Sequence, residues 1–385
     1  MIEDWQNGGF GVYVHWPFCQ AKCPYCDFNS HVAREIDQRQ WLNAYLQEID
    51  RYAQQVPGRA LTSVFFGGGT PSLMDPDVVH GILDRINSHW APSNDMEITL
   101  EANPGSVDAG RFAAYAQAGV NRVSMGIQSL NNRDLYRLGR IHSVEEARIA
   151  FDIARNQFSR VSFDLIYARQ DQTLDDWRTE LTEALNMAID HLSLYQLTIE
   201  EGTAFGDRYR RGKLRGLPGD DLAADMYAIT QEICEQNGMP AYEVSNHARP
   251  GAESRHNRIY WRYGDYVGIG PGAHGRLTIG DQRIATEAFS NPQAWLTRSS
   301  LGVTERQRIA LDKDDQGNEF LMMGLRLSEG ISHARYKSIT GHDLDQPKLD
   351  YLQEIGMIRV NGDNIAATPE GRMVLNSVIL ELLSE

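Results

Sequence analysis

The chain has 385 residues and carries 37 Lys and Arg against 52 Asp and Glu, which gives a net charge of −15 at neutral pH. This length allows a large core and more than one domain. The acidic balance argues against nucleic-acid backbones and anionic membrane surfaces as main partners, since both bind clustered positive charge. No stretch approaches the ~18 apolar residues of a membrane span, and the N-terminus lacks a signal-peptide pattern. We therefore expect a soluble cytoplasmic protein with reduced cysteines.

Six short apolar runs alternate with longer helical patterns between residue 10 and about residue 200. Such alternation indicates an α/β fold with a parallel sheet, because parallel neighbours need crossover connections. Six units are too few for a closed eight-stranded barrel. The expected strands are Gly11–His15, Val64–Phe66, Glu97–Glu101, Arg122–Ile127, Val161–Ile166 and His191–Leu197.

Three helix starts are expected between these strands. Asp75 is predicted to cap a helix whose first residue is Pro76. Ser143 and Glu146 have the spacing of a capping box. Thr173 is expected to open a third helix with an apolar face.

Polar or glycine-rich residues follow several of the expected strands. They are Gly67–Thr70 after the second strand, Glu101–Asn103 after the third, Gln128 and Ser129 after the fourth, and Asp164 in the fifth. The C-terminal ends of parallel strands gather at one edge of such a sheet, so these groups are expected to lie together. A glycine-rich turn alone is more often only a turn, but here it also suggests a nest of inward-facing amides.

Three cysteines lie within eight residues, at Cys19, Cys23 and Cys26. Three thiolates on one tight loop are suited to a cubane iron–sulfur cluster, and they would leave one iron open to a small molecule. The remaining cysteine, Cys234, lies inside a helical apolar pattern and is interpreted as a small buried hydrophobe.

Two other interpretations of the triplet rank behind the cluster. A structural zinc site would need a fourth ligand, for which His15 and His31 are the nearest candidates. Structural zinc cysteines, however, usually come in two separated pairs. A disulfide framework ranks lower still, because four cysteines in 385 residues are too few for a stapled secreted domain.

The run from Tyr13 to Phe28, with its Cx3Cx2C spacing, resembles the opening of radical S-adenosylmethionine (SAM) enzymes. It is most similar to the subgroup of oxygen-independent coproporphyrinogen dehydrogenases and HemW-type haem chaperones. The resemblance implies an open, partial (β/α)6 barrel and a [4Fe-4S] cluster on Cys19, Cys23 and Cys26, with SAM on the open iron. The dehydrogenases carry a fourth cysteine two positions after the third. Phe28 stands there in this chain, which favours the chaperone branch.

The same resemblance implies the residues that contact SAM. Gly69 and Thr70 would meet its methionyl end, Glu101 an ammonium or ribose hydroxyl, and Arg140 a carboxylate. The family usually shows a Gly-Leu-Pro-Gly-Gln turn after the fifth strand, whereas this chain has Ala-Arg-Gln-Asp-Gln at 168–172. The implied SAM residues are Tyr13, Tyr25, Gly68, Gly69, Thr70, Glu101, Gln128, Arg140 and Asp164.

The alternation stops after residue 200. Residues 208–219 are expected to form a linker or mobile loop, followed by a helix around Leu222–Gln236. The string His256-Asn-Arg-Ile-Tyr-Trp261 matches a motif of HemW-type chaperones, in which the resemblance assigns its histidine to haem. His247 and His274 are weaker haem candidates. Taken singly, each histidine is more often a satisfied structural residue.

The last part of the chain has the pattern of a winged-helix-like module. Helices are expected at Asn318–Leu327, Ser332–Ile339 and Pro347–Ile355, and a hairpin turn at Asn361-Gly362. Residues 301–385 hold nine Lys and Arg against fourteen Asp and Glu, a net charge of −5, so we interpret the module as structural or protein-binding. The expected domains are a radical SAM core at 1–200, a linker and aromatic/His extension at 201–309, and the C-terminal module at 310–385.

Two functions follow from the resemblance. The first is a haem chaperone that binds haem, keeps a SAM-coordinating [4Fe-4S] cluster and passes haem to apoproteins, with respiratory enzymes as candidate receivers. The alternative is an oxygen-independent coproporphyrinogen III dehydrogenase that cleaves SAM reductively. A homodimer is a candidate assembly, and no nucleic-acid partner is expected.

Overall fold

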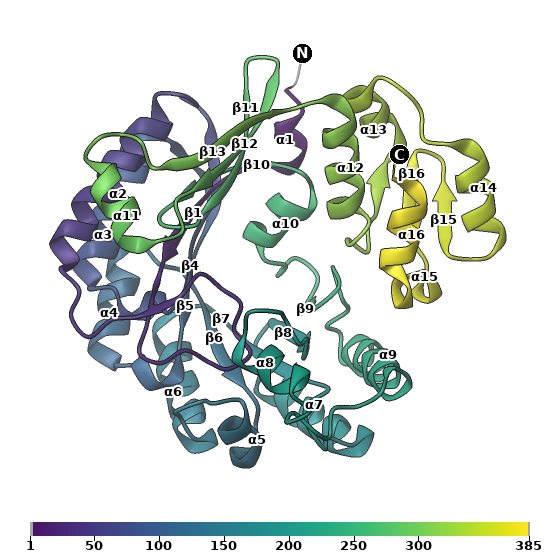
Figure 1. Ribbon diagram of the computed structural model, residues 1–385, viewed down its shortest axis with the longest axis horizontal. Coiled ribbons are helices and arrows are strands. Elements are labelled where there is room, and N and C mark those ends of the chain that lie inside the picture. Colours follow the sequence, from purple (N-terminus) through teal and green to yellow (C-terminus); the bar gives the residue numbers. More distant parts are fainter. Residues whose placement is uncertain (1–2, 384–385) are drawn as a thin grey trace.

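The computed structural model describes residues 3–383, and its largest element is an eleven-stranded sheet with helices on its outer face (Figure 1). Its central strands run parallel to their neighbours, with the order β1-β4-β5-β6-β7-β8. All six expected strands are therefore present, and the prediction of an open, partial (β/α)6 barrel is confirmed. They are β1 (Phe10–Trp16), β4 (Ala60–Gly68), β5 (Ala91–Ala102), β6 (Arg122–Gln128), β7 (Arg160–Tyr167) and β8 (His191–Gln196).

Residues 201–309 add strands to both edges of this sheet. β10 (Asp265–Ile269) pairs parallel with β1, and β9 (Asn246–Ala248) pairs antiparallel with β8. An antiparallel meander then extends the β10 edge through β11 (His274–Ile279), β12 (Gln282–Ala288) and β13 (Glu305–Leu311). Two short strands, β2 (Phe18–Cys19) and β3 (His31–Val32), pair with each other and frame the cysteine loop.

The outer helices begin where the sequence patterns place them. The capping boxes are formed at Ser143 with Glu146 and at Thr173 with Asp176. Asp75 occupies the predicted N-cap position but makes no capping hydrogen bond, because its carboxylate pairs with Arg111 at 3.2 Å. The outer helices are α2 (Gln38–Ala53), α3 (Pro76–His89), α4 (Ala109–Ala118), α6 (Val144–Gln157), α7 (Leu174–Met187) and α9 (Asp220–Gln236).

Shorter helices connect these elements, and one of them occupies part of the expected linker. Helix α8 (Ala204–Arg210) covers the first three residues of the 208–219 segment, so that segment is irregular only from residue 211. The others are α1 (Trp5–Gly8), α5 (Asn132–Arg137), α10 (Arg255–Trp261), α11 (Pro292–Ser299), and the 3-10 turns η1 (Pro71–Leu73) and η2 (Pro104–Ser106). No helix within residues 3–383 is long and apolar enough to cross a membrane.

The unusual 168–172 loop is built around a buried arginine. The Arg169 guanidinium pairs with Glu180 of α7 and, at 3.1 Å, with Asp134 of α5. Glu180 also accepts hydrogen bonds from the Ser129 hydroxyl and the Leu130 amide, just after β6. This loop therefore ties β6, α5 and α7 together, although it lacks the family's usual glycine-proline turn.

The C-terminal module forms beside α10 and has its own core (Figure 1). Its three-stranded sheet has the order β14-β16-β15, and Asn361 pairs with Asn364, so Gly362 and Asp363 form the hairpin loop. The expected turn is thus displaced by one residue, and the first helix begins earlier than expected. The elements are α12 (Lys313–Gly324), β14 (Ile331–Ser332), α13 (His333–Thr340), α14 (Gln346–Glu354), β15 (Ile358–Asn361), β16 (Asn364–Ala367), α15 (Pro369–Met373) and α16 (Leu375–Leu382).

Candidate cofactor site

A cavity lies where the cysteine loop covers the C-terminal ends of β4, β5, β6 and β7. All three loop cysteines line it, together with most of the residues that the resemblance assigns to SAM. The sheet topology explains the gathering, because parallel strands bring their polar ends to the same edge. The predicted residues that line the cavity are Cys19, Cys23, Cys26, Tyr25, Gly68, Gly69, Thr70, Glu101, Gln128, Arg140 and Asp164.

The cysteine thiols are free, half-buried and spread around the cavity. The Thr70 hydroxyl donates to the Cys19 sulfur at 3.5 Å, and the Arg140 guanidinium donates to the Cys23 sulfur at 3.4 Å. Among residues 3–383, no three His, Cys, Asp or Glu side chains converge closely enough to hold a single metal ion. Thiols spread around a cavity are instead suited to a cluster, in which each sulfur binds a different iron.

The glycine-rich turn after β4 is hydrogen-bonded to the segment that leads into the cysteine loop. The Gly69 amide donates to the Trp16 carbonyl at 2.6 Å, and the Thr70 amide donates to the Phe18 carbonyl at 2.8 Å. The prediction of ligand-facing amides is therefore wrong for Gly69 and Thr70, because both amides donate to backbone carbonyls of the protein. Gly68 has a φ of +109°, and a Cβ at this residue would lie 2.5 Å from the His15 ring, so only glycine fits.

Two carboxyl groups face the cavity from neighbouring parts of the sheet. Burial, followed by the charge of Asp164, raises the pKa of Glu101 to about 8. Burial also raises the pKa of Asp164 to about 6, and the Ser124 hydroxyl donates to it at 3.4 Å. Glu101 accepts a hydrogen bond from the Gly68 amide at 3.2 Å. Carboxyl groups with so few partners can take new hydrogen-bond donors, such as the ammonium and hydroxyl groups of SAM.

Arg140 provides the positive charge of the cavity. One guanidinium nitrogen donates to the Gly126 carbonyl at 2.6 Å, while its Nε is buried and has no hydrogen-bond acceptor within the described chain. An unpartnered buried donor is costly unless a ligand accepts from it, and a SAM carboxylate would do so. Gln128 reaches the cavity from a left-handed backbone conformation with a φ of +76°, which occurs at the end of β6 where the strand pairing is irregular.

Several residues that line the cavity were not among those predicted from the sequence. Ser124 and Gly126 lie on the same face of β6 as Gln128, so strand alternation was the signal that could have identified them. Lys22 and Ser30 come from the cysteine loop itself. Phe28, which replaces the dehydrogenases' fourth cysteine, lines the cavity and is 58% exposed.

Tyr13 and His256 lie deeper than the cavity and do not line it. The Tyr13 hydroxyl and His15 Nδ1 are 2.8 Å apart, and burial raises the pKa of Tyr13. The His256 ring stacks on Phe65 with the ring centres 4.1 Å apart, and Tyr13 and Tyr260 pack close to it. Burial, followed by the charge of Arg122, lowers the pKa of His256 to about 3, so its imidazole is neutral.

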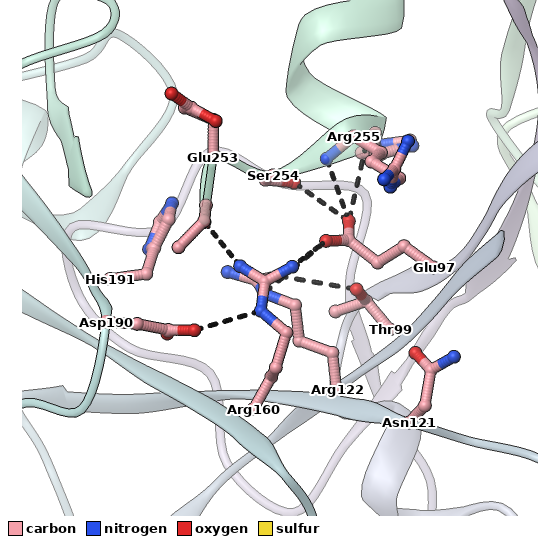
Figure 2. Close-up of polar contacts among 12 residues, drawn as sticks. Glu97, Thr99, Asn121, Arg122, Arg160, Asp190, His191, Glu253, Ser254 and Arg255 are labelled. Carbon is pink, nitrogen blue, oxygen red and sulfur yellow. Dashed lines mark hydrogen bonds and ion pairs between the residues drawn. The ribbon is translucent and has the colours of Figure 1, made fainter. Parts of the chain in front are cut away.

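The helix that carries His256 is fixed to strand β5 by one carboxylate (Figure 2). Glu97 Oε1 accepts hydrogen bonds from the Ser254 hydroxyl at 3.2 Å, the Arg255 amide at 3.1 Å and the His256 amide at 3.5 Å. The same carboxylate satisfies the first donors of α10 and stabilises the positive end of the helix.

Two arginines from neighbouring strands complete this cluster (Figure 2). Arg160 of β7 pairs with Glu97 at 2.9 Å and with Asp190 at 3.0 Å. Arg122 of β6 lies 3.9 Å from Glu97 and donates to the hydroxyls of Thr99 and Ser162. The charges at this end of the sheet therefore neutralise one another. Of the other two histidines, His247 is buried in β9, and His274 is exposed in β11.

Comparisons with known proteins agree with this geometry. Residues 13–183 match the model of the Radical SAM superfamily, and residues 311–374 match the HemN C-terminal domain. Coproporphyrinogen III oxidase (HemN) from Escherichia coli superimposes with a TM-score of 0.81 over 98% of this chain and 92% of that chain. Its identity is 22%, so it supports the fold alone.

Two relatives decide the family. Heme chaperone HemW of Escherichia coli K12 is 38% identical over 97% of this chain and 98% of its own length. The chain belongs to the HemW family of radical SAM proteins. The mitochondrial radical S-adenosyl methionine domain-containing protein 1 of Bos taurus is likewise 38% identical, over 97% of this chain and 87% of its own length.

Membership in this family makes a [4Fe-4S] cluster and SAM the cofactors of the cavity. The residues fit both groups. The three thiols supply the ligands of three irons, Arg140 offers an unpartnered buried donor, and Glu101 and Asp164 offer acceptors. When bound, the cluster can supply electrons to SAM or hold it in place.

Proposed function

We propose that the protein is a haem chaperone, which binds haem and passes it to haem-dependent apoproteins while it keeps SAM on a [4Fe-4S] cluster. The observation that carries the proposal is the near full-length identity of 38% with Heme chaperone HemW. The match covers 97% of this chain, so it extends beyond the barrel that all radical SAM proteins share.

Each residue of the cavity has a proposed task toward the cofactors. Cys19, Cys23 and Cys26 hold the cluster, and the donors of Thr70 and Arg140 lie against two of these sulfurs. Donors to cluster sulfurs stabilise their negative charge and adjust the reduction potential. The other SAM residues, proposed as a group, are Tyr13, Tyr25, Gly68, Gly69, Glu101, Gln128 and Asp164.

Phe28 supports the chaperone over the dehydrogenase. An exposed phenyl ring at the rim of the cavity supplies no sulfur where the dehydrogenases carry a further cysteine. The fold similarity to coproporphyrinogen III oxidase does not favour the alternative, because at 22% identity it reports only the fold.

His256 remains our predicted haem residue on the strength of its motif. Its ring is enclosed by Phe65, Tyr13 and Tyr260, so direct iron ligation requires α10 to move away from β4. A neutral imidazole is the form that binds iron, and burial keeps His256 in that form.

We also propose the setting in which the protein works. The cytoplasm is the proposed compartment, because its reducing conditions keep the four cysteines as free thiols. The receiving apoproteins are proposed to be haem enzymes, with respiratory enzymes first among them. A homodimer is a further prediction, which light scattering of the reconstituted protein tests. The three expected segments, 1–200, 201–309 and 310–385, serve as cofactor core, connecting part and contact module.

The proposal is tested by haem transfer. The anaerobically reconstituted protein is loaded with haem and mixed with a haem-free cytochrome apoprotein, and the appearance of the holo-cytochrome is followed by absorbance. Haem-loaded serum albumin at the same concentration is the control for passive release. We expect transfer faster than from albumin, and a rate equal to that from albumin would contradict a chaperone function.

A further inference from the structure

A second cleft lies between α9 and the C-terminal module, away from the cysteine loop. Its volume of about 780 Å³ falls in the range of roughly 300–1,000 Å³ typical of cofactor and ligand sites. One wall is α9, the base is formed by residues from 240 to 253, and the other wall comes from β15, β16 and α15. No residue assigned to the cluster or SAM lines it.

Apolar and aromatic side chains supply most of the walls. Tyr227 of α9 faces the cleft from one side and Met373 of α15 from the other, while Tyr242 lies at the base. Flat apolar ligands bind such surfaces, because ring faces and prolines cover a planar molecule at little conformational cost. The other apolar lining residues are Ala228, Pro240, Ala241, Ala248, Pro250, Ala367 and Pro369.

Two arginines of the cleft are available to an anion. Arg359 donates to the Ser328 carbonyl at 3.3 Å, and Arg372 donates to the Glu243 carbonyl at 2.7 Å and to the Arg326 carbonyl at 3.3 Å. Within residues 3–383, neither arginine forms an ion pair with a carboxylate. By contrast, two acidic residues of the cleft, Glu253 and Glu329, are already paired with Arg258, at 3.2 and 3.0 Å.

Two further carboxylates limit the ligand to a modest negative charge. Glu235 and Glu370 line the same cleft and would repel a polyanion such as a nucleotide. A ligand with two carboxylates and a large apolar body satisfies both arginines without excess charge.

We propose that this cleft is where haem binds, with its propionates on Arg359 and Arg372 and its ring against the tyrosines and prolines. The proposal rests on the haem-chaperone function and names the place of the cargo. The Tyr227 phenol and the Met373 thioether stand on opposite walls, and both groups are known types of haem-iron ligand.

The cleft is linked to the motif that carries His256. The Tyr242 hydroxyl accepts a hydrogen bond from the Asn257 side chain at 3.1 Å and lies 3.0 Å from His191 Nε2. Asn257 belongs to the motif, so the motif supports the base of the cleft. With the His256 ring enclosed as in the structure, the motif acts on the cleft through Asn257, and iron ligation by His256 itself would need the movement of α10 away from β4.

The test is a titration of the full-length, reconstituted protein with iron protoporphyrin IX, followed at the Soret band. Arg359→Glu reverses one of the two charges, and Ala228→Trp fills the cleft from α9. Both residues are exposed, so neither change disturbs the core. Arg178→Glu on α7 and Glu232→Trp on α9 are matched controls, because both are exposed and lie outside the cleft. Iron–sulfur content and circular dichroism are measured for every variant.

We expect Arg359→Glu to weaken haem binding roughly ten- to a hundredfold, the loss typical of one charge-assisted contact. Ala228→Trp should also weaken haem binding, because the indole would occupy the space of the haem ring. The controls should bind like the parent, and Tyr227→Phe or Met373→Leu should shift the Soret band. Parental affinity in both cleft variants would overturn the cleft assignment and leave the chaperone function standing. A parent chain that binds no haem would overturn the proposed function itself.

Discussion

Two glutamates on strand β5 show how differently the two ends of the barrel are built. Glu97 is buried among two arginines and accepts three hydrogen bonds from the start of α10. Glu101, four residues further along, faces the cavity and accepts one hydrogen bond, from Gly68. Burial raises the pKa of Glu101 to about 8, whereas Glu97 is surrounded by positive charge.

The contrast shows that Glu97 belongs to the structural framework and Glu101 to the cofactor site. A carboxylate whose acceptor positions are filled by the protein fixes two elements together, and it has nothing left to offer a ligand. A carboxyl group left with few partners is unfavourable in the empty protein, and ligand donors relieve that cost. The same residue type on the same strand therefore does structural work at one end of the barrel and binding work at the other.

The largest effect is expected on iron content, when the cluster ligands that line the cavity are removed. Replacing Cys19, Cys23 and Cys26 with Ala should abolish the binding of about four irons per chain, because a cubane cluster cannot be held without its thiolates. Cys234→Ala is the matched control, since its side chain is buried in α9 outside the cavity. Iron and sulfide analysis measures the result, and iron retained by the triple variant would contradict the assignment.

The next largest effect is expected on stability, at the end of the barrel where Glu97 is buried. Glu97→Gln should lower the free energy of unfolding by about 3–5 kcal/mol, because it leaves buried Arg122 and part of Arg160 without their counter-charge. Glu101→Gln should cause no such loss at neutral pH. Urea unfolding of the iron-free chains measures both. If Glu97→Gln and Glu101→Gln destabilised the chain equally, the two glutamates would not differ in structural role.

A smaller effect is expected in the pH dependence of stability. The carboxyl of Glu101 keeps its proton in the folded chain up to a pH of about 8, whereas its ordinary pKa is 4.5. Between these values the unfolded chain binds fewer protons than the folded chain, so stability should fall as pH rises. Glu101→Gln should remove part of this decline and be more stable than the parent at pH 8. An unchanged slope between pH 5 and 8 would show that Glu101 ionises normally.

The smallest and most selective effect is predicted for His256→Ala. Haem affinity should fall while iron–sulfur content stays unchanged, because the two sites use different segments of the chain. Joint loss of cluster and haem would mean that the imidazole is needed for folding, and unaltered haem binding would remove His256 from the haem site. His80→Ala is the matched control, since His80 is exposed on α3 and is not a haem candidate.

Local signals account for what the sequence could predict. Cysteine spacing, capping boxes and strand alternation act over a few residues, so the cluster loop, the helix starts and the six parallel strands follow from them. The position of the glycine turn was predicted, but the partners of its amides were not. They donate to the Trp16 and Phe18 carbonyls, and no sequence spacing indicates these hydrogen bonds.

Contacts between distant segments account for the rest. β10 joins the sheet beside β1 although about 250 residues separate them in the chain, and no pattern in either strand specifies this pairing. Glu97 gives no sign in the sequence that it holds the helix at Arg255. The enclosure of His256 depends on Phe65 and Tyr13, which lie more than 190 residues earlier.

The most direct test of the central claim is a pair of assays on one anaerobic preparation. The reconstituted protein receives SAM and a reductant, and haem binding and the conversion of coproporphyrinogen III to protoporphyrinogen IX are measured in parallel. A haem chaperone with Phe28 at the rim of its cavity should bind haem and form no protoporphyrinogen IX. Sustained product formation without haem binding would contradict this account and establish the dehydrogenase instead.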